Sequence, residues 1–126
     1  MTLFTCTIEG RPIVKKNTQR TIRRHGLTTV IYSPQFRDWE KFAIVKLMQA
    51  HEHRPPITSA IAMTIRFFMK NNASLPDLSN LIEGPQDAMK KAGVIKDDKL
   101  IAMIHASRHV DGNPRVEIEL KPLEAA

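Results

Sequence analysis

A stretch of nine residues near the middle of the chain constrains the fold more than any other. From Ile61 to Met69, an apolar side chain stands at every second position, in the order Ile61, Met63, Ile65, Phe67, Met69. This period of two is typical of a strand with one face against a hydrophobic core. The stretch therefore predicts a central strand, and the segments around it must supply the layer that covers its apolar face.

The flanking segments have the patterns of two helices and several further strands. Ser33-Pro34 offers a cap followed by proline, and apolar residues then recur at helical spacing to about residue 50. A second helix is expected over 77–92, with a kink or a fresh start at Gly84-Pro85. Alternation or β-branched composition predicts the other strands, at 3–9, 27–32, 100–107 and 116–120. The order ββαβαββ predicts a single α+β domain, a mixed sheet packed by two helices.

Length and composition limit the classes of protein that remain. With 126 residues and 42% apolar content, the chain can close one modest core, and we expect one domain over 1–122 and a frayed tail over 123–126. No apolar stretch reaches membrane-spanning length, and the first residues lack the order of a signal peptide. The single Cys6 cannot form an internal disulfide. We therefore expect an intracellular protein with no membrane partner, held together by packing.

The net charge of +6 is concentrated in one segment. Between Arg11 and Arg24 there are six cations and no acid, so the cations and acids of the rest of the chain balance. The segment is expected to be a loop between the strands at 3–9 and 27–32. A local basic cluster on a neutral body suits contacts with a nucleic-acid backbone, although a solvated surface loop would have the same composition.

Five acids lie within 22 positions of the second predicted helix and the turn after it: Asp77, Glu83, Asp87, Asp97 and Asp98. On the helix, Asn80, Glu83 and Asp87 share one face. If the chain returns beside the helix, Asp97 and Asp98 would lie against its first turn. Converging carboxylates are the ligands of a magnesium ion in a nuclease, whereas a helix cap at Asp77 and a solvated charged face are the structural alternative.

The same residues resemble the RusA family of Holliday junction resolvases. Pro76-Asp77-Leu78-Ser79-Asn80-Leu81, Asp87-Ala88-Met89, Gly93 and Asp97-Asp98 match that family's signature, in which Asp-x-Asp-Asn-Leu opens a helix and Gly-x-x-x-Asp-Asp ends the segment. The spacing fits without gaps. A looser similarity extends to the Lys15-Lys16-Asn17 region and to Tyr32-Ser33-Pro34, so the resemblance covers most of the chain.

The resemblance implies roles for single residues. Asp77 matches the first essential aspartate, Asp98 the last and Asp97 its acidic neighbour, while Asn80 and Asp87 are supporting residues. Two positions depart from the signature: Ser79 stands where many members have a second aspartate, and Glu83 where they have a catalytic lysine. Because Ser79 and Glu83 are four residues apart on one helix, we hypothesise that Glu83 supplies the missing carboxylate. The catalytic set is then Asp77, Glu83 and Asp98, and the metal ligands are those three and Asp97.

The resemblance also implies an activity. It is hydrolysis of DNA phosphodiesters by magnesium-activated water, with manganese as an alternative ion, in a homodimer that makes paired symmetric nicks across a four-way junction. The source would be a phage or prophage, and the location a bacterial host cytoplasm. The junction backbone would be held by six residues of the basic segment: Lys15, Lys16, Asn17, Arg20, Arg23 and Arg24.

Two other functions remain open from the residues alone. A junction-binding or architectural protein with a weakened metal site would share the basic segment and would explain the departures at Ser79 and Glu83. An RNA-binding module would need aromatic or glycine-rich recognition motifs, which the chain lacks. Magnesium-dependent nicking separates the resolvase from the architectural protein, because both would bind branched DNA.

Overall fold

The computed structural model describes residues 1–15 and 19–124, and of residues 19–24 and 28–32 it describes the backbone only. The elements are, in chain order, β1 (Phe4–Glu9), β2 (Gln19–Arg24), β3 (Leu27–Tyr32), α1 (Pro34–His51), β4 (Ile61–Met69), α2 (Leu78–Lys91), the short 3-10 helix η2 (Asp98–Leu100), β5 (Ile101–Val110) and β6 (Arg115–Pro122). Each predicted helix and strand is present, and β2 is an addition.

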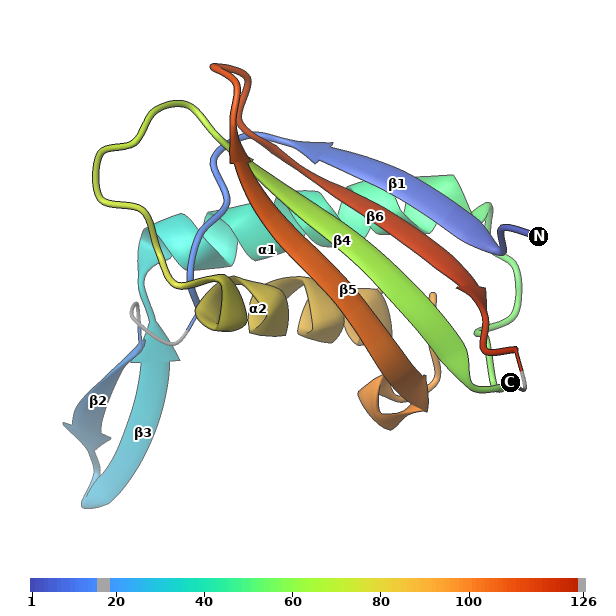
Figure 1. The fold of residues 1–126 in the computed structure, drawn as a ribbon. Coiled ribbons are helices and arrows are strands. Elements are labelled where there is room, and N and C mark those ends of the chain that lie inside the picture. Colours follow the sequence, from blue (N-terminus) through green and yellow to red (C-terminus); the bar gives the residue numbers. More distant parts are fainter. Residues whose placement is uncertain (16–18, 125–126) are drawn as a thin grey trace.

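Four strands form the main sheet, in the order β1-β6-β4-β5. β6 is antiparallel to both β1 and β4, whereas β5 runs parallel to β4. The predicted α+β fold with a mixed sheet is therefore confirmed. Both helices cover the same face of this sheet and leave the other face open (Figure 1). Within the described residues, neither helix is long and apolar enough to cross a bilayer.

The core lies between the sheet and the two helices. Ile61, Met63, Ile65 and Phe67 of β4 are each at most 1% exposed, as the alternating pattern predicts. They pack with buried side chains of the neighbouring strands and both helices: Ile8, Val116, Ile118, Leu120, Phe36, Trp39, Ala43, Leu47, Leu81, Ala88 and Met89. The polar residues of β4 point to the open face, so the sheet has one buried and one solvated side.

α2 is one helix through Pro85, so the prediction of a fresh helix start at that position is wrong. Proline removes a single backbone hydrogen bond, and Leu81, Ala88 and Met89 on either side of it hold the helix against the core. Gly84 lies where α2 meets α1, and a β-carbon there would come within 3.2 Å of Phe36 Cε1. The absence of a side chain at Gly84 therefore allows the two helices to approach closely.

The second half of the basic segment is a strand, which corrects the expectation of a loop. Arg20, Arg23 and Arg24 belong to β2, which pairs antiparallel with β3 in a separate two-stranded sheet. This hairpin extends from the main body beside the start of α1 (Figure 1). An isolated two-stranded hairpin gains little stability from burial. The three arginines thus belong to an arm and not to the main sheet.

The carboxyl-terminal residues are bound to the main sheet as far as Leu123. Its N–H donates to the carbonyl of Ala60 over 3.1 Å. The predicted tail over 123–126 is thus attached at its first residue, while Ala125 and Ala126 lie outside the described residues.

Candidate active site

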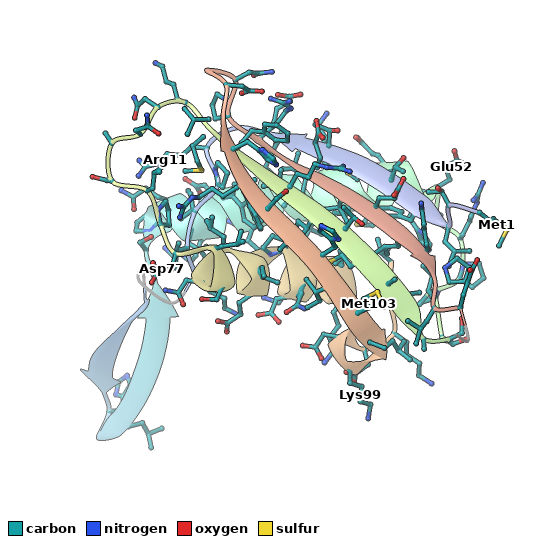
Figure 2. All side chains as sticks on the ribbon, viewed as in Figure 1. Met1, Arg11, Glu52, Asp77, Lys99 and Met103 are labelled. Atoms are coloured by element: carbon teal, nitrogen blue, oxygen red, sulfur yellow. The ribbon has the colours of Figure 1, made fainter. Side chains whose placement is uncertain are left out.

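Asp77 is the N-cap residue of α2, yet its side chain makes no capping hydrogen bond. The residue is exposed and lies at one end of the helix (Figure 2). An aspartate at this position usually accepts a bond from a backbone N–H of the first helical turn. Since this bond is missing, a capping role does not explain the aspartate at position 77. Its carboxylate can instead bind a cation.

The other predicted residues of α2 lie along its length. Ser79 and Glu83 are exposed, and Asn80 is half-buried. Asp87 forms a salt bridge with Lys15, whose side chain is only 12% exposed. This pair ties the start of the basic segment to the middle of α2, so Asp87 has a structural role in addition to any role in a site.

Asp97 and Asp98 lie in the turn between α2 and β5. The Asp97 carboxylate caps η2 by accepting from the backbone N–H of Lys99 over 3.0 Å. This hydrogen bond, together with one to the Asp98 carboxyl and the nearby cations Lys90 and Lys99, lowers the pKa of Asp97 from its ordinary value. Asp98 is exposed. The turn therefore carries two adjacent acidic side chains, one of which caps η2.

Asp77 and the Asp97-Asp98 pair lie at opposite ends of α2, so Asp97 and Asp98 do not return to its first turn, the condition on which a single-chain site depended. Because β4 and β5 are parallel, α2 runs back along the sheet between them. Lys96 N donates to Ile57 O over 3.0 Å, which places the turn near the start of β4. The 14-residue helix separates Asp77 from this turn by about 20 Å, and Figure 2 labels Asp77 at the start of α2 and Lys99 in the turn beyond its other end.

No group of three or more histidine, cysteine, aspartate or glutamate side chains within the described part of the chain could hold a metal ion. A single chain thus places Asp77 and Ser79 at the start of α2 and Glu83 near its middle, while Asp97 and Asp98 lie beyond its other end. The residues are oxygen donors of the kind that divalent cations prefer. They fit a metal site if a second copy of the chain supplies the missing acids.

Two arginines near Asp77 were not among the predicted site residues. The Arg108 side chain, on β5, donates to the carbonyl of Pro76 and brings a cation to the start of α2. Arg11 lines an open cavity of about 710 Å³ with Pro12, Ser33 and Pro76. Arg108 shares one face of β5 with Ile104 and Ala106, opposite the core-facing residues of β4, so its face could have been predicted from the sequence, but its proximity to Asp77 depends on the strand pairing.

The predicted DNA-binding residues are placed only in part. Lys15 is described and pairs with Asp87. Lys16 and Asn17 lie outside the described residues, and for Arg20, Arg23 and Arg24 only the backbone on β2 is described. The hairpin is on the same side of the molecule as Asp77 (Figures 1 and 2).

Comparisons with known proteins identify the family. The sequence model of the family described as Endodeoxyribonuclease RusA matches residues 9–121. The chain is also 31% identical over 115 residues to the crossover junction endodeoxyribonuclease RusA of Aquifex aeolicus (strain VF5), an alignment that covers 90% of this chain and 87% of that protein. The match includes both ends of α2, the cavity beside Asp77 and the hairpin arm. This chain belongs to the RusA family of endodeoxyribonucleases.

Proposed function

We propose that the protein resolves four-way DNA junctions by divalent-metal-dependent hydrolysis of a phosphodiester in each of two strands, and that it does so in the cytoplasm of a bacterial host cell. The observation that carries the proposal is the exposed Asp77 carboxylate, which makes no capping bond at the start of α2. The family membership and the name of the Aquifex relative support the reaction and the junction substrate.

Because the acids of one chain lie far apart, we infer a homodimer in which each active site takes acids from both chains; we call these composite sites. β5 is an edge strand of ten residues, and it exposes Met103, Ile104 and Val110 by 58%, 43% and 41%. Apolar edge strands are templates for pairing with another chain. Two copies of β5, paired antiparallel about a two-fold axis, would set the Val110 end of one copy beside the Ile101 end of the other.

This pairing would form two equivalent sites. The Asp77 end of each α2 adjoins the Val110 end of β5, since Arg108 contacts Pro76, and the Asp97-Asp98 turn adjoins the Ile101 end. Asp77 and Glu83 of one chain would then share a site with Asp97 and Asp98 of the partner. Two sites related by a two-fold axis suit symmetric nicks in a junction that has the same symmetry.

Within each site, the chain's own residues would bind and orient the substrate. Asp77, Glu83, Asp97 and Asp98 would hold magnesium or manganese, which when bound supplies positive charge against the phosphate and activates the attacking water. Arg108, beside Asp77, would stabilise the negative charge that builds on the phosphate. The cations of the hairpin arm would position the backbone of the junction without reading its sequence.

The proposed function predicts junction-specific nicks that need a divalent metal. We expect the purified protein to cut a labelled four-way junction with magnesium, to leave a matched linear duplex intact, and to cut neither with a chelator. The Asp98→Asn variant should bind the junction but not cut it. If the native chain binds the junction tightly and makes no nicks with magnesium or manganese, it is an architectural junction-binding protein instead.

A separate prediction concerns Glu83, which is exposed one turn after Ser79 on α2. If Glu83 supplies the carboxylate that Ser79 lacks, Glu83→Gln should lower the cleavage rate by about 10- to 100-fold, and adding Ser79→Asp should restore most of it. Single-turnover rates on the junction measure both effects. Near-normal cleavage by Glu83→Gln would show that Glu83 takes no part.

A further inference from the structure

The cavity that contains Arg11 lies directly beside Asp77. Its walls come from three segments: residues 11–14 before the hairpin, the start of α1 and the loop 74–76 before α2. Pro76 is the residue before Asp77 and lines the cavity, so any group inside it is next to the proposed point of hydrolysis. The volume of about 710 Å³ falls within the range of sites that accept small ligands.

The lining of the cavity has the chemistry of a nucleobase site. Ile13, Leu75 and Pro76 are half-buried and provide apolar surface, on which the face of a base can stack. Ser33, Gln35 and Ser74 add hydroxyl and amide groups, which can donate and accept hydrogen bonds at the edge of a base. This combination of apolar walls and a few polar groups is typical of pockets that recognise a flat heterocycle.

The charges around the cavity favour a nucleotide over a neutral ligand. Arg11 is exposed and contributes a cation to the lining. No carboxylate lines the cavity among the described residues. A phosphate that continues the strand beyond the scissile bond would therefore meet a cation beside the cavity, while its base enters the apolar part.

We propose that this cavity receives one unstacked DNA base next to the phosphate that is cut, and that Gln35 reads the edge of this base and so contributes to the choice of cleavage sequence. The inference rests on the proposed nuclease function, because it assumes that Asp77 marks the point of hydrolysis. It adds a specificity site, formed by described residues, to the phosphate contacts of the arm.

A fluorescent base analogue tests the proposal without cleavage. 2-Aminopurine is placed at each nucleotide around the branch point in turn, and its emission is measured with the chelator present. We expect the native chain to change the emission at one position by at least about twofold, because the base leaves its stack. Gln35→Phe fills the cavity and should abolish the change, whereas Gln49→Phe, at the other end of α1, should preserve it. The emission of each variant is read at saturating protein, and Gln49→Phe should bind the junction within about threefold of the native chain.

Cleavage on a set of junctions that differ in the bases around the branch gives the second readout. Gln35→Ala, which keeps the cavity open, should cut the set with a flatter preference than the native chain. An unchanged preference in Gln35→Ala, or an emission change that survives Gln35→Phe, would overturn the proposal. Magnesium-dependent cutting without any emission change would rule out the base site and would still support the nuclease function. An emission change without cutting removes the nuclease function, and with it the assignment of this base as next to a cut.

Discussion

Asp77→Asn is expected to reduce junction cleavage by about 100-fold or more while junction binding stays within about threefold. Asparagine has the size of aspartate but no charge, so it is a much weaker ligand for magnesium. Asp77 is exposed and makes no capping hydrogen bond, and the substitution should therefore leave the stability of α2 unchanged. Single-turnover cleavage in magnesium and fluorescence anisotropy in chelator measure the two quantities.

Glu52→Gln is the matched control for Asp77→Asn. It also removes one exposed negative charge, but Glu52 lies at the far end of the molecule from Asp77 (Figure 2). We expect this control to cut at the native rate. A loss of cleavage in Glu52→Gln equal to that in Asp77→Asn would mean that overall charge, and not a metal ligand, limits the rate.

Phe67→Ala should have the largest effect on stability. The side chain is 1% exposed and points into the core from the central strand β4. Loss of a buried phenylalanine costs about 3–5 kcal/mol, a large part of the roughly 5–15 kcal/mol that stabilises a typical domain. Urea unfolding at fixed protein concentration should show a midpoint far below that of the native chain.

The adjacent Phe68 provides the control, because it faces the open side of the sheet. Its ring stacks on His109 with 4.9 Å between centroids, and the Arg115 guanidinium lies 3.7 Å from its centroid. These contacts are worth about 1–2 kcal/mol together, so Phe68→Ala should be much less destabilising than Phe67→Ala. An equal loss of unfolding free energy in the two variants would contradict a core on only one face of the sheet.

Much of the fold could be predicted from local patterns. The alternation in β4 identifies its buried face, and Ser33-Pro34 marks the start of α1, where Ser33 Oγ accepts from Phe36 N over 3.2 Å. β2 was missed because Gln19–Arg24 carries three arginines and one apolar residue, so no alternation marks it as a strand. Its backbone pairs with β3 over its whole length, which no sequence pattern within the segment indicates.

The residues of the candidate site could be predicted from the sequence, but their positions relative to one another could not. Whether Asp97 and Asp98 return to the start of α2 or stay at its end depends on the direction of β5 relative to β4. Strand direction follows from tertiary pairing, which no local pattern of either segment specifies. The same holds for Arg108, which reaches Pro76 only because β5 ends where α2 begins.

Mixing two inactive variants tests directly whether Asp77 of one chain and Asp98 of the other form one active site. Asp77→Asn and Asp98→Asn are unfolded together, refolded at equal concentration and assayed for nicking of the four-way junction with magnesium. Half of the dimers would then be mixed, and each mixed dimer would have one site with both substitutions and one with neither. We expect recovery to about a quarter of native nicking, as single nicks without paired resolution. A refolded mixture that stays as inactive as either variant alone would show that the two chains do not share an active site.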